Sequence, residues 1–188
     1  MKIILASASE RRQELLKRLI SDFDVIVSDF DEDKVDFMGS IDEYVKEIAL
    51  GKAMDVRKRV SKDSIIISAD TVVALDNKIL GKPKDEKEAF KMLKSLQGRT
   101  HFVYSGVVVI NNKENIIRQK SQATKVKFSN MSDEEIFQYI NTKEPMDKAG
   151  AYGIQGIGGV FVESIEGCYY NVVGLPLNSL RSILKEIL

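Results

Sequence analysis

The alternation of apolar and polar positions divides the first third of the chain into short predicted elements. Residues 2–6 form an apolar run typical of a buried strand, and residues 13–20 carry apolar side chains at helical spacing. Residues 23–30 alternate as a strand does, whereas the acidic and irregular residues 31–40 predict a loop. Ser40 and Glu43 have the spacing of a capping box, which predicts a long helix that ends near residue 61.

The middle of the chain has the strongest strand signal. Residues 64–81 are rich in Ile and Val, with a predicted turn at residues 76–77. A helix is predicted over residues 85–96, because Gly98 is a suitable residue just beyond its end. Residues 100–110 and 116–128 then predict a hairpin around a turn at residues 111–112.

The last third begins with a second capping box, formed by Ser132 and Glu135, which predicts a helix to about residue 142. Residues 150–159 hold five of the twelve glycines of the chain. Strands are predicted at residues 160–165 and 169–173, and a final helix after Pro176. Because strands and helices are interleaved and the middle contains hairpins, the pattern predicts an α/β fold with a mixed sheet.

Composition narrows the class of protein. The 188 residues fit one domain, and 28 basic residues balance 28 acidic ones, which argues against a dedicated nucleic-acid binder but leaves room for a local basic pocket. The chain has a single cysteine and a single histidine, so neither a disulfide nor a zinc site of His and Cys is expected, whereas a cation held by carboxylates remains open. With no signal-peptide or membrane-spanning run, we expect a soluble cytoplasmic protein.

The segment LASASERR places hydroxyls and two arginines where a strand leads into a helix. Ser7, Ser9, Arg11 and Arg12 can form a phosphate cradle there, because helix N-termini and guanidinium groups both bind anions. The alternative is structural: Ser9 caps the helix and the arginines are solvated. Arginines placed against the helix dipole favour the functional interpretation.

The segment SADTVVALDNKILGKP contains a carboxylate inside an apolar strand. A buried Asp70 needs a partner, a cation or a raised pKa, and Thr71 adds a hydroxyl beside it. Lys82 lies between Gly81 and Pro83 on a stiff turn, where it can bind phosphate. The alternative is an Asp at the end of a strand and a solvated lysine, and the pattern does not decide between them.

The segment KEPMDKAGAYGIQG joins a helix stop at Pro145 to a glycine-rich stretch. Glycines let the backbone approach a ligand closely, although the spacing is not that of a Walker A loop, and the amide of Gln155 can read a base edge. On the pattern alone, an ordinary flexible loop is favoured here. A nucleoside triphosphate site needs cations for the phosphates, a carboxylate for Mg²⁺ or water, and an amide for the base. The candidate residues of these three segments together match that set.

Other polar residues are less informative on their own. Lys52, within the predicted long helix, is expected to be solvated, and Glu32 lies in the acidic loop, where it can help to hold a cation. His101 has no Cys or Asp dyad nearby and is interpreted as structural. Cys168 shows no signature of a nucleophile.

Six ordered blocks, LASASERR, SADTVV, GKP, GRTHFVYSGV, KEPMDKAGAYGIQG and IEGCYYNVVGLP, resemble the Maf proteins, a family of nucleoside triphosphate pyrophosphatases once named for inhibition of septum formation. The resemblance runs from residue 3 to about residue 178, and the fifth block resembles the subgroup that hydrolyses dTTP and UTP. It implies the mixed α/β fold of the inosine-triphosphate pyrophosphatases (Maf/Ham), with an elongated central sheet and helices in two lobes around a cleft, as one Maf-like domain over residues 1–188. Homodimers are common in the family.

The resemblance also implies an activity. A triphosphate would be cleaved between its α and β phosphates to a monophosphate and pyrophosphate, with a divalent cation, Mg²⁺ or Mn²⁺, and with dTTP, UTP and modified pyrimidine nucleotides as substrates. Such an enzyme cleans the nucleotide pool, and the old family name adds a link to cell-division arrest. Two alternatives stay open: a non-catalytic regulator of septum formation that binds nucleotide or nucleic acid, and an enzyme of this fold that acts on purine nucleotides.

Family roles carry over residue by residue. Asp70 matches the proton acceptor, which accepts a proton from water or holds the metal, and Glu32 matches an acidic position near the metal. Four residues match family positions that line the phosphate cleft, with Arg11 adjacent to them: Ser7, Arg12, Lys52 and Lys82. Three residues match family positions tied to substrate choice: Arg12, Thr71 and Gln155. Glu10 is a departure, since the family usually has proline there, and its charge is expected to weaken phosphate binding slightly.

Overall fold

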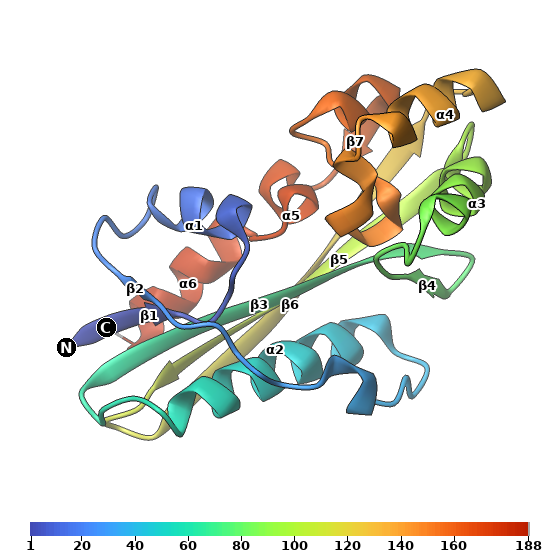
Figure 1. The fold of residues 1–188 in the computed structure, drawn as a ribbon. Coiled ribbons are helices and arrows are strands. Elements are labelled where there is room, and N and C mark those ends of the chain that lie inside the picture. The colour runs from blue at the N-terminus through green and yellow to red at the C-terminus, as the bar shows by residue number, and fades with distance from the viewer. Residues whose placement is uncertain (188) are drawn as a thin grey trace. The chain divides into compact units, whose positions relative to one another are not determined.

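A computed structural model describes residues 1–187. It contains a mixed seven-stranded sheet in the order β2-β1-β3-β5-β6-β7, with β4 paired to β3 (Figure 1). The strands are β1 (Lys2–Leu5), β2 (Asp24–Val25), β3 (Ser64–Leu75), β4 (Lys78–Leu80), β5 (Thr100–Asn111), β6 (Ile116–Phe128) and β7 (Val162–Glu166). β1 runs parallel to β2 and β3, whereas β4 is antiparallel to β3 and β7 to β6, so the predicted mixed α/β sheet is confirmed.

The helices alternate with these strands along the chain. The α-helices are α1 (Glu10–Leu16), α2 (Ile41–Arg57), α3 (Glu86–Leu96), α4 (Asp133–Asn141), α5 (Tyr169–Val173) and α6 (Leu177–Ile187). Short 3₁₀ turns are η1 (Glu32–Lys34), η2 (Glu144–Asp147), η3 (Ala149–Ala151) and η4 (Ile157–Phe161). None of these helices within residues 1–187 combines the length and apolar character of a membrane span.

The chain forms two compact units; three of the boundaries between them fall inside β3, β5 and β6, and the fourth follows α5. The first unit comprises residues 1–71, 105–122 and the chain from residue 174 onward; the second comprises residues 72–104 and 123–173.

In the first unit, α2 covers one face of the strands, and α1 and α6 lie on the other face (Figure 1). The side chain of Ser40 caps α2 by accepting a hydrogen bond from the backbone N–H of Glu43. A core of buried apolar residues joins this helix to the strands: Ile4, Ala6, Ala49, Ala53, Val56, Ile66, Val108 and Ile110. This packing fixes α2 against β3, the strand that carries Asp70.

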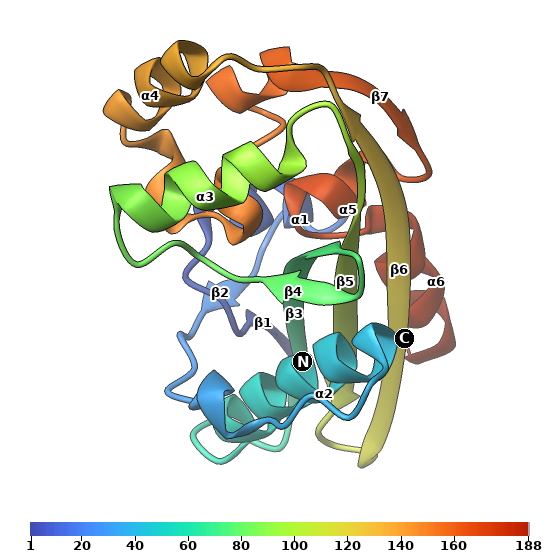
Figure 2. The same cartoon turned by 90° about the vertical axis from the view of Figure 1, so that its right-hand side faces the viewer.

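The second unit has its own core between α3, α4 and the strands. Ser132 and Glu135 form the predicted capping box at the start of α4, with both reciprocal hydrogen bonds present. α4 packs against α3, as Figure 2 shows, and the side chain of Asp85 caps α3. This core combines aliphatic residues with three buried aromatic ones: Phe128, Tyr139 and Tyr152.

The predicted strand at residues 169–173 is wrong, because this segment is the helix α5. Its aromatic and β-branched residues favour a strand by local propensity. The carbonyl of Cys168 accepts from the N–H groups of Asn171 and Val172, which is a helical turn, and tertiary contacts of Asn171 override the local strand preference. The buried amide of Asn171 then donates to the carbonyl of Val103 and the hydroxyl of Thr124.

The predicted strand over residues 23–30 shrinks to the two residues of β2. Beyond β2, the backbone N–H of Asp29 and the hydroxyl of Ser28 donate to the carboxylate of Asp55 on α2. These polar groups therefore bond to a helix side chain and not to a neighbouring strand, which ends the pairing.

Candidate functional site

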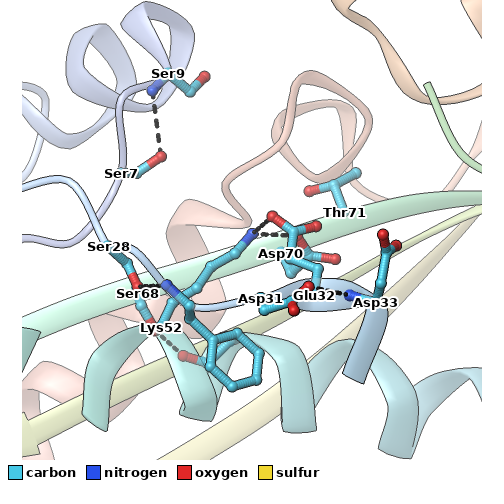
Figure 3. Close-up of polar contacts among 12 residues, drawn as sticks. Ser7, Ser9, Ser28, Asp31, Glu32, Asp33, Lys52, Ser68, Asp70 and Thr71 are labelled. Carbon is cyan, nitrogen blue, oxygen red and sulfur yellow. Dashed lines mark hydrogen bonds and ion pairs between the residues drawn. The ribbon is translucent and has the colours of Figure 1, made fainter. Parts of the chain in front are cut away.

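Asp70 is a buried carboxylate on β3, only 6% exposed. Lys52 reaches it from α2, with its Nζ 2.7 Å from Asp70 Oδ1 and 2.8 Å from Glu32 Oε1 (Figure 3). One ammonium group thus contacts two carboxylates. The expectation that Lys52 is solvated is wrong, because its side chain is only 13% exposed and forms an ion pair with the buried carboxylate of Asp70.

The segments that carry these three groups come from different parts of the sequence. β3 is held to α2 beside the pair, because the hydroxyl of Ser68 donates to the carbonyl of Ala49. Ser68 and Asp70 are two residues apart on the strand and therefore face the same helix. Glu32 belongs to the short turn η1, where Asp31 caps the backbone N–H of Asp33.

Arg12 is the centre of a second cluster, on α1. Its Nε donates to the carbonyl of Gly174 at 2.9 Å, and its other two nitrogens lie 3.1 Å from Thr71 Oγ1 and 3.4 Å from Ser7 Oγ. Burial lowers the pKa of the Arg12 guanidinium, and the negative charge of Asp70 opposes that effect. A guanidinium remains protonated at neutral pH, so Arg12 supplies a fixed positive charge.

Thr71 is itself held in place by two further contacts. Its hydroxyl lies 2.8 Å from the hydroxyl of the fully buried Ser105 and 3.3 Å from the carbonyl of Gly174. Successive residues of a strand point to opposite faces, so Asp70 faces α2 while its neighbour Thr71 contacts Arg12. Two adjacent residues of β3 therefore anchor the two clusters.

The serines at the start of α1 serve the backbone as well as the arginine. Ser9 is the N-cap of α1 and accepts from the N–H of Arg12, so the structural alternative stated for this residue is confirmed. Ser7 is buried, and its hydroxyl accepts from the N–H of Ser9 and from Arg12. Arg11 lies on the first turn of α1, where its side chain is partly exposed.

Lys82 and Gln155 belong to the second unit. Lys82 is exposed and follows β4, next to Gly81, whose carbonyl accepts from the N–H of Gly150. Gln155 is exposed on the glycine-rich segment between η3 and η4. His101 is buried in this unit, where burial lowers its pKa to about 4 and its Nε2 lies 2.8 Å from the hydroxyl of Tyr152.

Sequence reasoning identified Ser7 and Thr71 but missed two other groups that hold Arg12 and Thr71, which are Ser105 and the carbonyl of Gly174. Ser105 has the same signal that singled out Asp70, since it is a polar residue inside a buried apolar strand. Gly174 has a φ of +123°, a conformation that favours glycine, and its carbonyl points at Arg12. A backbone acceptor of this kind leaves no mark in the pattern of side chains.

Comparisons with known proteins find relatives that match the whole length of this chain. A protein of Clostridium botulinum (strain Eklund 17B / Type B) named dTTP/UTP pyrophosphatase is 70% identical over 186 residues, which cover 99% of each chain. Proteins of the same name from Clostridium beijerinckii and Clostridium novyi are 70% and 62% identical over 187 residues, covering all of this chain and 100% and 98% of the relatives.

Solved structures share the fold at low sequence identity. A HAM1 protein from Coxiella burnetii has a TM-score of 0.55 at 15% identity, and the Staphylococcus aureus Ham1 protein 0.53 at 16%, each with 99% of both chains covered. The predicted likeness of fold to the Ham proteins is confirmed. The model of the family described as Maf-like protein matches residues 2–187 of this chain, which therefore belongs to the Maf-like family.

Proposed function

We propose that this protein is a nucleoside triphosphate pyrophosphatase that hydrolyses dTTP and UTP to the monophosphate and pyrophosphate. The observation that carries the proposal is the Lys52 ammonium between the carboxylates of Asp70 and Glu32, in a chain 70% identical to proteins named dTTP/UTP pyrophosphatase. A carboxylate and a cation held together in a buried setting suit the activation of water next to a charged phosphate.

Asp70 is assigned as the proton acceptor. Its Oδ1 is bound to Lys52, so Oδ2 is the atom that we assign to take the proton of the attacking water. The water attacks the α-phosphorus in line, and the bond from that phosphorus to the bridging oxygen breaks to release pyrophosphate. Lys52 keeps Asp70 oriented and adds positive charge where negative charge develops.

Arg12 is assigned to bind the phosphates, with Ser7, Arg11, Lys52 and Lys82 as further donors. Three hydrogen bonds orient its guanidinium, out of the five N–H groups that an arginine carries. The remaining donors suit a bidentate contact with a phosphate, which is the geometry that a guanidinium fits best. Thr71 contributes to substrate choice through its hold on Arg12.

The donor set fits a divalent cation in part. Glu32 and Asp70 converge on one cation, the Lys52 ammonium, and carboxylate oxygens are the ligands that Mg²⁺ and Mn²⁺ prefer. Within residues 1–187 there is no group of three or more His, Cys, Asp or Glu residues placed to hold a metal. We assign Asp70 and Glu32 as the protein groups that would hold such a cation, which when bound would neutralise phosphate charge.

Gln155 is assigned to read the base. Its amide can accept from N3–H and donate to O4 of uracil or thymine, whereas cytosine presents the reverse pattern of donor and acceptor. The proposal therefore includes rejection of CTP.

A panel of nucleoside triphosphates with pyrophosphate release as the readout tests the proposal. UTP and dTTP should be the best substrates, and release should require added Mg²⁺ or Mn²⁺. If a purine triphosphate were the best substrate, the result would favour the alternative of an enzyme of this fold that acts on purine nucleotides. Absence of release from every nucleotide would favour the non-catalytic regulator.

Asp70→Asn tests the assignment of the proton acceptor. The variant should bind UTP, measured by calorimetry, and lose most turnover, because general bases contribute about 10²–10⁴-fold to rate. Asp36→Asn, at an exposed position of the loop before α2, is the matched control and should keep wild-type kcat. A wild-type kcat in Asp70→Asn would remove Asp70 from this role.

A further inference from the structure

The glycine-rich segment closes around a carboxylate of its own chain. Glu144, in η2, accepts from the backbone N–H of Ile157 at 2.8 Å and of Gly158 at 3.0 Å. The same carboxylate accepts from the hydroxyl of Tyr139 at 2.8 Å. The pattern alone favours an ordinary flexible loop, whereas in the structure two of these hydrogen bonds tie the segment to Glu144.

Tyr139 supplies a second anchor on the other side of Gln155. Its hydroxyl accepts from the backbone N–H of Gly153 at 3.2 Å, and the residue is only 2% exposed in the core of the second unit. Gln155 thus lies between an anchor at Gly153 and an anchor at Ile157 and Gly158. Both anchors depend on the pair formed by Tyr139 and Glu144.

Two glycines of this segment, Gly156 and Gly158, lie directly against that pair. A Cβ on Gly156 would lie 2.3 Å from Glu144 Oε2, and one on Gly158 would lie 2.4 Å from the hydroxyl of Tyr139. Real Cβ atoms essentially never lie this close to a neighbour, so with a larger residue at either position the backbone or the side chain of Glu144 or Tyr139 would have to shift. The glycines serve close approach, as the sequence predicts, but the group approached is Glu144.

The charge of Glu144 is stabilised in place. Partial burial alone would raise the pKa of Glu144, but hydrogen bonds from Gly158, Ile157 and Tyr139, together with the charge of Lys148, outweigh it and lower the pKa. Lys148 also donates to the backbone carbonyl of Glu144 at 2.7 Å. Because the N–H groups of Ile157 and Gly158 are bonded to this carboxylate, they do not serve a phosphate.

We propose that Glu144 is a positioning residue for base selection: with Tyr139, it fixes the loop of residues 153–158 so that Gln155 is presented in one orientation. The inference rests on the proposed function, in which Gln155 reads the base. Glu144 acts through the loop and contacts no reacting atom. A positioned amide discriminates between uracil and cytosine only when its donor and acceptor are held in register with the base.

The test compares UTP with CTP in four variants: Glu144→Gln, Glu144→Ala, Tyr139→Phe and Gln155→Ala. The readout is the ratio of kcat/KM for UTP to that for CTP, because a merely structural defect lowers both rates together. Glu144→Ala should reduce this ratio between about tenfold and a hundredfold, the range expected when a substrate-positioning group is displaced. Glu134→Gln, on the exposed face of α4, is the control and should keep the wild-type ratio.

Glu144→Gln gives a graded prediction. Oε1 of Glu144 accepts from both Tyr139 and Gly158, and Oε2 accepts from Ile157. A glutamine keeps one carbonyl oxygen for the first two bonds and loses the third, so its ratio should fall between those of the wild type and Glu144→Ala. Tyr139→Phe, which keeps the ring in the core, should reduce the ratio as well, and it keeps the test available if Glu144→Ala does not fold.

A double variant separates this role from a general effect. If Glu144 acts through Gln155, then Glu144→Ala combined with Gln155→Ala should have the same ratio as Gln155→Ala alone. Additive losses, or an unchanged ratio in folded Glu144→Ala, would overturn the inference while leaving the wild-type activity established. If the wild-type protein releases no pyrophosphate from UTP or dTTP, it is the proposed function that fails, and the inference falls with it.

Discussion

Arg12 is held by three neighbours, of which Thr71 and Gly174 are distant in sequence and Ser7 is close. The carbonyl of Gly174, the hydroxyl of Thr71 and the hydroxyl of Ser7 each accept from a different nitrogen of its guanidinium. These contacts use the planar fork of an arginine, which a lysine cannot reproduce. An arginine at a helix N-terminus is therefore oriented before any phosphate binds.

Arg12→Lys should lower kcat/KM for UTP by about tenfold to a hundredfold, or roughly 1.4–2.7 kcal/mol of transition-state stabilisation. The charge is kept, so the loss would report the fork and its orientation. Arg18→Lys, at an exposed position after α1, is the matched control and should keep wild-type kinetics. Equal kinetics in Arg12→Lys and the wild type would mean that charge alone suffices.

His101 should make stability depend on pH. Its pKa is lowered from 6.5 to about 4 by burial, so the unfolded chain binds this proton more tightly than the folded one. The stabilising contribution is complete above pH 6.5 and is lost as the pH falls towards 4, by roughly 3 kcal/mol in total.

Denaturant titrations between pH 7 and pH 4.5 measure this slope. His101→Gln should flatten it, because the chain has a single histidine and no other histidine can titrate in this window. A variant with the wild-type slope would assign the pH dependence to other groups.

At the scale of elements, β3 and α2 bring Asp70 and Lys52 together because a shared apolar core and the hydrogen bond from Ser68 to Ala49 hold the helix against the strand. β5 joins this arrangement at Gly106, where a Cβ would lie 2.3 Å from the backbone carbonyl oxygen of Val45 on α2. The glycine therefore sets how closely the helix approaches the strands of the first unit.

Gly106→Ala should destabilise the protein by about 1–3 kcal/mol, the usual effect of overpacking, since α2 has to move away. Gly81→Ala is the matched control, because a Cβ there has no neighbour within 4 Å and stability should change by less than about 1 kcal/mol. Urea unfolding of both variants measures the difference. An unchanged urea midpoint in Gly106→Ala would show that α2 can shift without a loss of stability.

Local patterns predicted those elements whose partners lie nearby in sequence. The capping box of Ser132 and Glu135 closes within one helical turn, so spacing alone identifies it. Asp70 was identifiable as a carboxylate in an apolar strand. The helix α5 was not, because its conformation depends on contacts of Asn171 with Val103 and Thr124 far along the chain.

Glu144 was missed for a related reason. Its partners at Ile157 and Gly158 are backbone N–H groups, which every residue type carries, so no side-chain pattern marks them. The glycines were visible, yet the sequence does not say which group they approach.

At the scale of the whole molecule, basic and acidic residues are equal in number, and the candidate site has its own local group of cations. The chain has no net charge, with 28 basic and 28 acidic residues, while Arg12 and Lys52 are gathered beside Asp70 in the first unit. Such a distribution attracts a small polyanion to one place without attracting long ones to the surface.

Duplex DNA should therefore not bind at about 150 mM salt and micromolar protein. The measurement is a gel shift repeated over a range of salt concentrations. A complex whose log affinity falls with log salt more steeply than about −3 would indicate several phosphate contacts and would support the nucleic-acid alternative.

The anchoring of residues 153–158 has a consequence for how base preference can change. Every group of the Tyr139–Glu144 anchor belongs to one continuous stretch of chain, residues 139–158. The loop shape depends on backbone groups, so the side chain at position 155 can be exchanged while the shape is kept. New base preferences can therefore be sampled by substitution at position 155 alone, while Tyr139 and Glu144 keep the loop in place.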